Sequence, residues 1–448
     1  MTFLEAPVRL AMTGVFDMAN FGDALFPLVA SHALSAYGIG VQTVAPTAQR
    51  VPLADAHQPI GLSALDALLD DSDGLLIGGG HVLHAHPLDL MVEYRGLPEA
   101  GWAGPGLWLG AGALAARKGL PVMFNAPGMP HPLPGRWHAL ARAVAGSSAY
   151  LALRDTGSAD LLAKASGHRA LTVPDTIAAL PGLWPRASLA PLAKAFRQRE
   201  GIAAQEAVVC IHVRDRSLSG TSAHDVAEGL DAAARAMGAR LVLCALGRAH
   251  EDERTAAAIA DHMTTRPIVY DQPPSLQEMA AVLAHARAYL GASLHGFVVA
   301  HAYGVPSMLV ARPAYRKFSG YLQWIGEPDL AVGDWAQGLG WLRRVAPGAQ
   351  GAGIPAAVDA ALAAHWQRIA QITRQTRHQR EQAGSPGQTA QQAPVQAFLA
   401  RLGLEQAGIE DIMKAIQSEG MQSSGRAEPG SASPHSLEAA ASASGAPS

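Results

Sequence analysis

Residues 287–306 read Arg-Ala-Tyr-Leu-Gly-Ala-Ser-Leu-His-Gly-Phe-Val-Val-Ala-His-Ala-Tyr-Gly-Val-Pro, and this stretch decides the fold class. The pattern predicts a buried strand over 287–292, a helix over 296–303, and a helix stop before the next buried strand at 306–310. Alternation of this kind is typical of a parallel sheet covered by helices. His295 therefore falls where a strand ends and a helix begins.

That position favours a role for His295 in chemistry. Ligands of open α/β sheets gather beyond the carboxyl ends of the strands, where helix N-terminal N–H groups converge. The positive end of a helix dipole lowers the pKa of an imidazole and strengthens its hold on an anion, which suits a phosphate or carboxylate substrate. The alternative is that His295 only caps the turn.

The same alternation extends from Val8 to Val310 in two blocks, which predicts an α/β protein with two doubly wound, Rossmann-like domains facing a cleft. This pattern, with the composition of the C-terminal part, predicts how the chain is divided into domains. An N-terminal domain covers residues 1–185, a C-terminal domain 200–345, a helix 355–383, and a largely disordered tail 384–448 with a short helix at 395–416. Disorder is expected from Ser418 onward, because that composition buries little apolar area.

Composition excludes several classes of protein. The chain has 448 residues, of which 49% are hydrophobic and 16% charged, with a formal net charge of −3, so no basic field for nucleic acid is present. Cys210 and Cys244 lie in apolar runs and are expected to be reduced core residues. The N-terminus lacks the pattern of a signal peptide, and no apolar run is long enough to span a membrane, so a cytoplasmic location is expected.

Two motifs in the first block could contact a ligand. Asn20 and Asp23 form a polar turn after the first strand, and Gly78, Gly79 and Gly80 follow the strand that begins near Gly74. Glycines there let backbone N–H groups approach a ligand closely. The alternatives are that Asp23 caps the following helix and that the glycines serve packing. Nearby histidines at 81, 84 and 86 show no fourth ligand, so their spacing disfavours a metal site.

Cations follow strand ends in both blocks. Arg154 stands at one strand tip, where a guanidinium can grip a carboxylate or phosphate through two hydrogen bonds. Arg214 and Lys317 follow strands of the second block, and together these cations predict a multiply charged small anion. Arg154 could instead form a salt bridge with Asp155 or Asp175, and the cations could be scattered surface charge.

Together these motifs resemble the polysaccharide pyruvyl transferase family. The resemblance rests on Asn-x-Gly-Asp at 20–23, the glycine triplet at 78–80, Arg-Asp-x-x-Ser at 154–158, Pro-Asp at 174–175, Ser-Leu-His-Gly at 293–296 and Lys317, and it covers residues 10 to 325. It implies a fold like the two-domain glycosyltransferases of the B type. It also implies phosphoenolpyruvate as the donor, a sugar hydroxyl pair as the acceptor, a pyruvate ketal as the product, and no cofactor or metal.

The resemblance also assigns roles. His295 is similar to the family's essential histidine, a general acid, and Arg154 and Lys317 are similar to its cationic donor contacts. Asn20, Asp23 and the glycines 78 to 80 would then shape the acceptor side. The chain departs from many members at Ser293, where they have arginine. Arg214, Arg312 or Arg316 would have to supply the missing charge.

Three functions remain open from the sequence. The first is a pyruvyl transferase acting on a cell-surface glycan or its lipid-linked precursor, which would bring it to the inner face of the membrane. The second is a glycosyltransferase that uses a nucleotide sugar, with Glu278 as the one candidate for ribose binding. The third is a sugar-binding protein without catalysis, which would tolerate loss of His295.

Overall fold

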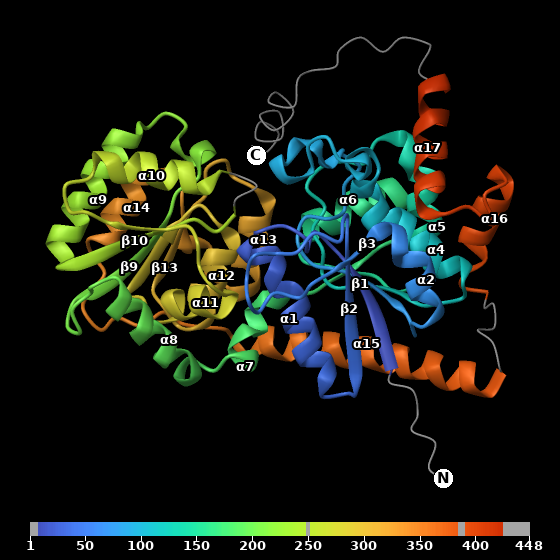
Figure 1. The fold of residues 1–448 in the computed structure, drawn as a ribbon, viewed down its shortest axis with the longest axis horizontal. Helices are drawn as coiled ribbons and strands as arrows, with labels where there is room; N and C mark the ends of the chain where they lie inside the picture. Colours follow the sequence, from blue (N-terminus) through green and yellow to red (C-terminus); the bar gives the residue numbers. More distant parts are fainter. Residues whose placement is uncertain (1–7, 248–250, 384–389, 424–448) are drawn as a thin grey trace, which may run out of the picture.

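The first parallel sheet is built around strand β1 and belongs to the N-terminal domain, which lies to the right in Figure 1. A computed structural model describes residues 8–247, 251–383 and 390–423. Within them this sheet has the order β3-β2-β1-β4-β5-β6, with every pairing parallel. Its strands are β1 (Val8–Thr13), β2 (Ile39–Ala45), β3 (Ile60–Gly61), β4 (Leu75–Ile77), β5 (Val122–Phe124) and β6 (Ser148–Tyr150).

A second parallel sheet forms the C-terminal domain and has the matching order β11-β10-β9-β12-β13-β14. Its strands are β9 (Ala207–His212), β10 (Ala239–Cys244), β11 (Ile268–Tyr270), β12 (Ala288–Gly291), β13 (Ser307–Val310) and β14 (Ala331–Val332). The prediction of two Rossmann-like domains is confirmed. The strands that carry the expected motifs, β1, β4, β9 and β12, are central in their sheets, which places their carboxyl ends in the middle of each domain.

Helices cover both faces of each sheet (Figure 1). In the N-terminal domain they are α1 (Phe21–Ser35), α2 (Leu65–Asp70), α3 (Ala103–Pro105), α4 (Ala111–Arg117), α5 (His138–Gly146), α6 (Thr156–Ser166) and α7 (Leu180–Leu183). Next along the chain come α8 (Arg186–Arg199), α9 (Ala223–Met237), α10 (Asp252–His262), α11 (Leu276–Ala284), α12 (Leu294–Ala302), α13 (Arg316–Ile325) and α14 (Trp335–Leu342). A short two-stranded sheet, β7 (Ala152–Leu153) with β8 (Leu171–Thr172), leads into α6 and carries Arg154 just beyond its end.

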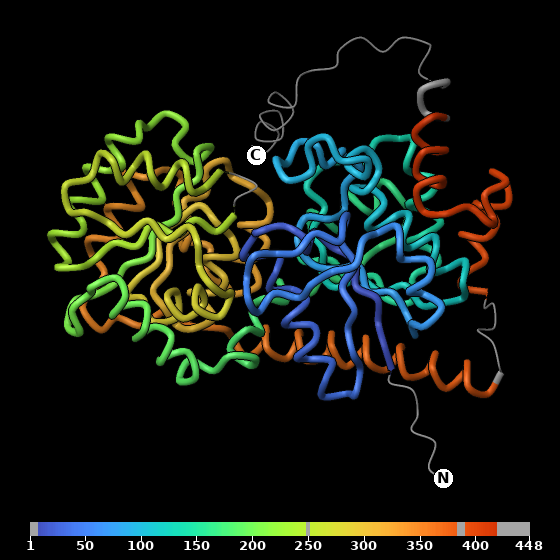
Figure 2. The backbone as a smooth tube through the Cα atoms, viewed as in Figure 1, coloured from blue at the N-terminus to red at the C-terminus, as the bar shows by residue number. Residues whose placement is uncertain are grey.

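Helix α15 (Ala356–Ala383) ties the two domains together. Its 28 residues span roughly 42 Å at 1.5 Å per residue, and Figure 2 shows it starting at the junction of the domains and running beneath the N-terminal domain. Val358, Leu362 and Ile369 are buried in a hydrophobic core that includes residues of both sheets. Arg377 and Arg380 each lie 3.6 Å from the buried carboxylate of Asp73 at the foot of the N-terminal sheet. Helix α15 therefore connects the two domains on one side of the molecule. The carboxyl ends of the strands of the two sheets face each other away from this helix.

The C-terminal segment differs from its prediction. Two helices, α16 (Ala393–Leu402) and α17 (Ile409–Ser423), stand where a single helix at 395–416 was expected, because Gly403 adopts a left-handed φ of 66° that ends the first. Ser418, expected to begin the disorder, lies inside α17. Buried apolar residues such as Ile412 and Met413 hold this helix against the N-terminal domain. Residues 384–389 and 424–448 of the predicted tail lie outside the described residues.

Two short strands, β3 and β14, were not expected, because two residues give no periodic signal. Both cysteines are free and buried on adjacent strands, as predicted. Among the helices that the structure describes, none has the length and apolar character needed to cross a membrane.

Candidate active site

The turn between β1 and α1 joins the two domains at their strand ends. Phe21 N donates a hydrogen bond of 2.8 Å to the carbonyl oxygen of Leu246, and Asn20 forms an isolated β-bridge with Gly247. Asn20 also caps α1, because its side chain accepts from the N–H groups of Gly22 and Asp23. The alternative that Asp23 is the cap is therefore wrong. The carboxylate of Asp23 is left for another role in the first turn of the helix.

Gly22 makes room for His295. A Cβ added to Gly22 would lie 1.7 Å from Nδ1 of His295, a distance that real atoms do not approach. The imidazole also packs edge-on against Phe26, with ring centroids 5.4 Å apart. The catalytic candidate of the C-terminal domain is thus seated directly against the first turn of the N-terminal domain.

His295 is the second residue of α12 and does not cap it. Ser293 is the cap, since its hydroxyl accepts from Gly296 N at 3.3 Å. Nε2 of His295 lies 3.7 Å from Oδ2 of Asp175, and the side chain is 18% exposed. The imidazole therefore combines a carboxylate neighbour with access to solvent, a combination that suits proton transfer.

Arg154 is buried with its charge only loosely paired. Its Nε lies 3.7 Å from Asp155 Oδ2 and its Nη1 lies 3.6 Å from Asp175 Oδ2, while the side chain is only 4% exposed. Both distances exceed that of an ordinary hydrogen bond. The predicted salt bridges therefore exist, but they do not satisfy all the N–H donors of the guanidinium. Nε and Nη2 of Arg154 find no hydrogen-bond partner within the described part of the chain. Buried unsatisfied donors of this kind are rare and mark a place where a ligand can bind.

Asp155 and Gly128 fix the guanidinium from two sides. Asp155 caps α6 by accepting from Ser158 N at 2.7 Å, which orients the carboxylate beside Arg154. A Cβ at Gly128 would lie 2.6 Å from Nε of Arg154 and 2.7 Å from Cδ2 of His81. His81 is therefore a neighbour of Arg154 that the sequence analysis considered only as a metal ligand. Its position directly after the glycine triplet was the available signal.

The electrostatics of the two central acids differ. Burial alone would raise the pKa of Asp175, but His295 and Arg154 outweigh burial and hold that pKa below its ordinary value. For Asp23, burial dominates and raises the pKa, although His295, Lys317 and Arg154 each act to lower it. Asp175 is therefore the charged partner of the imidazole. Asp23, with its raised pKa, holds a proton more tightly than Asp175 does.

Lys317 lies at the start of α13 and completes the group of cations. Burial and then the nearby charges of Arg214 and Arg154 lower its pKa to about 7. The same causes, burial first and then Arg154 and Lys317, hold the pKa of His81 well below its ordinary value. Several cations repelling one another in one place raise the affinity for an anion, which relieves the repulsion.

Arg214 reaches this group from the end of β9. Its Nε lies 3.3 Å from Oδ1 of Asp252, and Oδ2 of the same carboxylate lies 3.0 Å from Nε2 of His212. His212 and Asp252 are fully buried. Asp252 was missed in the sequence because it stands 38 residues after Arg214, and only the fold brings the two together.

Helix α13 closes the site from the C-terminal domain. Arg316 Nη2 donates to the carbonyl oxygen of Pro130 at 2.7 Å, and Trp324 Nε1 donates to the carbonyl oxygen of Arg154 at 3.2 Å. Arg316 is thus used in an interdomain hydrogen bond, and Arg312 lies beside Gly220. Of the three residues considered as substitutes for an arginine at position 293, Arg214 contributes to the lowered pKa of Lys317, second only to burial.

The glycine triplet is explained largely by packing. A Cβ at Gly78 would meet the carbonyl oxygen of Thr13 at 2.4 Å, and one at Gly79 would meet the ring of Phe26 at 2.2 Å. Gly80 has a left-handed φ of 80°, and its added Cβ would lie 2.7 Å from Oδ1 of Asp23. A contact of these glycines with a ligand stays a prediction.

The site therefore combines cations, two acids and one accessible imidazole at the junction of the domains. The predicted site residues that the structure brings together are His295, Arg154, Asn20, Asp23, Gly80, Arg214, Ser293 and Lys317. Such an arrangement can bind a small multiply charged anion and exchange a proton with it.

Comparison with known proteins gives the following. A family described as Polysaccharide pyruvyl transferase matches residues 20–313, close to two thirds of the chain. No curated protein sequence matches.

Among solved structures, the UDP-GlcNAc 2-epimerase from Methanocaldococcus jannaschii is 11% identical with a TM-score of 0.51, over 82% of this chain and 99% of that one. UDP-N-acetylglucosamine 2-epimerase from Rickettsia bellii is 11% identical with a TM-score of 0.50, over 84% and 98%. At this level of identity the likeness concerns the fold alone, a pair of Rossmann-like domains of the glycosyltransferase B type.

Proposed function

Since the chain belongs to the polysaccharide pyruvyl transferase family, we propose that it transfers the enolpyruvyl group of phosphoenolpyruvate onto a cell-surface polysaccharide or its lipid-linked precursor. The product is a pyruvate ketal on a pair of sugar hydroxyls. One observation carries the donor assignment. Among the residues that the structure describes, two nitrogens of the buried Arg154 guanidinium find no hydrogen-bond partner, and they lie near Lys317 and His295.

In phosphoenolpyruvate the carboxylate and the phosphate ester oxygen are bonded to the same carbon atom, so the two charged groups lie close together. A guanidinium binds either group through two parallel hydrogen bonds, and an ammonium binds as a point charge. Arg154 and Lys317, with Arg214 nearby, supply positive charge for both groups. Binding also relieves the mutual repulsion that depresses the pKa of Lys317.

The reaction needs one acid and one base in turn. His295 donates a proton to the methylene carbon of the donor, which becomes a methyl group while the neighbouring carbon takes up positive charge. One sugar hydroxyl bonds to that carbon and releases its proton. Phosphate then departs with the C–O electron pair, and the second hydroxyl bonds to the same carbon. One of the two hydroxyl protons thus replaces the proton given to carbon, and the other leaves with phosphate.

The acids beside His295 fit this sequence. Asp175, 3.7 Å from Nε2 of His295 and held ionised, stabilises the protonated imidazole. Asp23, whose pKa is raised by burial, suits acceptance of a hydroxyl proton. Asn20 and the glycines 78 to 80 shape the acceptor side next to it. No cofactor is required by this chemistry.

A nucleotide-sugar glycosyltransferase is the competing function, because the fold alone does not decide the chemistry. It needs an acidic group for the ribose, and Glu278 was the candidate. The carboxylate of Glu278 is engaged by Arg199 at 2.7 Å and by the hydroxyl of Tyr270. This engagement favours pyruvyl transfer over the competing function.

The direct test is product formation. Purified protein is incubated with phosphoenolpyruvate labelled with carbon-13 at the methylene carbon and with a panel of glycans and lipid-linked oligosaccharides. Acceptor-dependent phosphate release together with a labelled methyl group on the glycan supports the proposal. Turnover of a nucleotide sugar without either signal contradicts it. Association with the inner face of the membrane is expected only through a lipid-linked acceptor, and flotation with acceptor-bearing vesicles tests it.

A further inference from the structure

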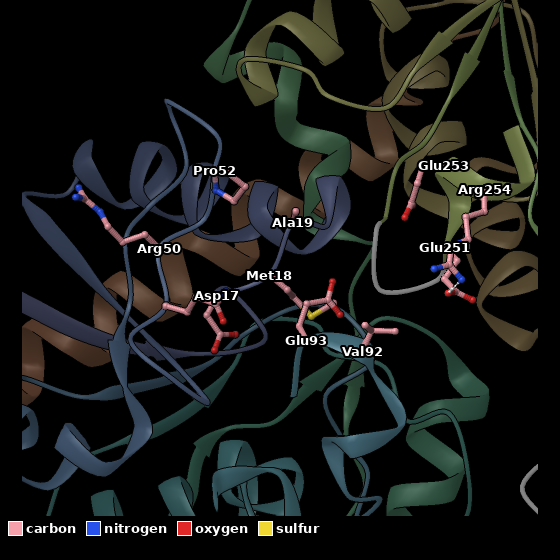
Figure 3. A pocket seen from close by; sticks show the side chains of 11 residues that line it. Asp17, Met18, Ala19, Arg50, Pro52, Val92, Glu93, Glu251, Glu253 and Arg254 are labelled. Carbon is pink, nitrogen blue, oxygen red and sulfur yellow. Dashed lines mark hydrogen bonds and ion pairs between the residues drawn. The ribbon is translucent and has the colours of Figure 1, made fainter. Parts of the chain in front are cut away.

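A pocket of about 290 Å³ opens between the two domains beside the cation group and is distinct from it (Figure 3). The N-terminal domain contributes the loop after β1 and the short helical turn Val92–Tyr94, and the C-terminal domain contributes the start of α10. Its lining consists of Asp17, Met18, Ala19, Gln49, Arg50, Pro52, Val92, Glu93, Glu251, Glu253 and Arg254.

The pocket adjoins the candidate active site along the chain. Asp17 to Ala19 immediately precede the Asn20–Asp23 turn, and Gly22 in that turn contacts His295. Three trans peptide steps at ~3.8 Å each put the Cα of Ala19 within about 11 Å of that of Gly22. A molecule in the pocket can therefore extend toward the imidazole.

Two carboxylates of the pocket have oxygens available. Oε2 of Glu93 and Oε2 of Glu253 are buried atoms with no hydrogen-bond partner in the described segments of the chain. The other two acids of the lining, Asp17 and Glu251, have partners within the protein. Asp17 accepts from the hydroxyl of Tyr94 and from Thr47, while Glu251 pairs with Arg254. The two available carboxylates come from different domains, and Figure 3 shows them on opposite sides of the gap.

Beside Gln49, Arg50 and Arg254, the lining includes apolar side chains. Val92 is 46% exposed, and Met18 also lines the pocket. A sugar presents hydroxyl donors around its rim and C–H groups on its faces. Carboxylate oxygens accept from hydroxyls in strong, charge-assisted bonds, and an apolar side chain covers a C–H face. The same carboxylates repel a ligand that carries a carboxylate of its own.

We propose that this pocket binds the acceptor glycan and selects uncharged or amino sugars over acidic ones. The inference rests on the proposed pyruvyl transfer, and it assigns the selection to Glu93 and Glu253. Positive charge for the donor and negative charge for the acceptor are then separated within one interdomain opening, which prevents the donor from occupying the acceptor site.

The test compares sugars that differ only in one group. Methyl galactoside, glucoside and mannoside and their three uronic acid counterparts are presented to the full chain saturated with phosphoenolpyruvate, and binding is measured by saturation-transfer NMR. We expect at least one neutral glycoside to bind severalfold better than its uronide. In Glu93→Gln and Glu253→Gln that preference shrinks severalfold, and in Glu93→Lys it reverses. Glu228→Gln, on the exposed surface of α9, is the matched control and keeps the wild-type preference.

Failure of this inference is separable from failure of the proposed function. Calorimetry with phosphoenolpyruvate alone is run on the same proteins. Donor binding combined with equal binding of neutral and acidic sugars, or with no sugar binding at all, overturns the acceptor pocket. Absence of donor binding with charge-selective sugar binding overturns pyruvyl transfer and leaves the pocket as a sugar site.

Discussion

The two domains share one strand order yet bring different chemistry to their common edge. In the N-terminal domain the central strands end in glycines and acids, with Gly22 and Asp23 after β1. In the C-terminal domain the corresponding ends carry His295 and Lys317. Arg154 comes from the N-terminal side and is covered by α13 of the other domain. The scaffold is therefore repeated, while the site is divided, and neither domain holds it alone.

The largest expected effect tests the chemical contribution of the C-terminal domain. In His295→Asn the proton donor to carbon is lost, so turnover should fall by about 10²- to 10⁴-fold, the usual range for a general acid. Donor affinity should change only severalfold. Steady-state kinetics and calorimetry measure the two quantities, with His262→Asn on the exposed surface of α10 as the control. Unchanged turnover would remove His295 from the mechanism.

The next effect tests the contribution of the N-terminal domain. Arg154→Ala removes the buried guanidinium and one of the two cationic neighbours of Asp175, leaving His295. Truncating one partner of a buried charge pair between protein and ligand costs about 2–5 kcal/mol, so donor affinity should fall by about 30-fold or more at ~1.4 kcal/mol per tenfold. Calorimetry measures this fall after thermal unfolding has shown that the variant is folded. Arg142→Ala, exposed on α5, should bind the donor normally, and equal affinity in both variants would contradict the assignment.

A third change tests the contact between the domains. A methyl group at Gly22 would meet Nδ1 of His295 at 1.7 Å, so Gly22→Ala should displace the imidazole. A misplacement of about 1 Å can cost roughly 10²-fold in turnover, with donor affinity largely retained. Gly182→Ala, where the added atom meets nothing within 4 Å, is the control. Similar kinetics for the two variants would show that His295 is not positioned by this contact.

The smallest effect is a pH dependence of donor binding. Lys317, with its pKa lowered to about 7, is charged below that pH and neutral above it. The donor phosphate, with a second pKa of about 6, keeps most of its charge from about pH 6.5 upward. Donor affinity should therefore be highest below pH 7 and fall as pH rises, by at most about tenfold per unit. In Lys317→Met the affinity should be low and independent of pH, and a retained slope would assign the effect to another group.

Much of the fold could be predicted from the sequence because it depends on local patterns. Buried strands such as β9 and β12 are continuous apolar runs, and Gly304 before Pro306 ends α12 where expected. The two-residue strands β3 and β14 could not be found, since they carry no periodicity. The division of the last segment into α16 and α17 depends on one left-handed glycine, which composition does not reveal.

The sequence predicted which residues form the candidate site better than it predicted how they contact one another. His295, Arg154 and Lys317 stand at strand ends, where local reasoning applies. That Asn20 and not Asp23 caps α1 depends on the backbone conformation of the turn. That Asp252 orients Arg214 depends on a contact between distant segments. Packing explains Gly78 and Gly79 directly, and only three-dimensional neighbours could separate that reason from ligand contact.

The central claim is that the cations at the domain junction hold phosphoenolpyruvate. Calorimetric titration of the purified full chain with phosphoenolpyruvate, and then with UDP-N-acetylglucosamine and other nucleotide sugars, tests it most directly. The account predicts saturable binding of phosphoenolpyruvate that is lost in Arg154→Ala, with no binding of nucleotide sugars. Binding of a nucleotide sugar in the absence of any heat from phosphoenolpyruvate would contradict it and make the chain a glycosyltransferase on the same fold.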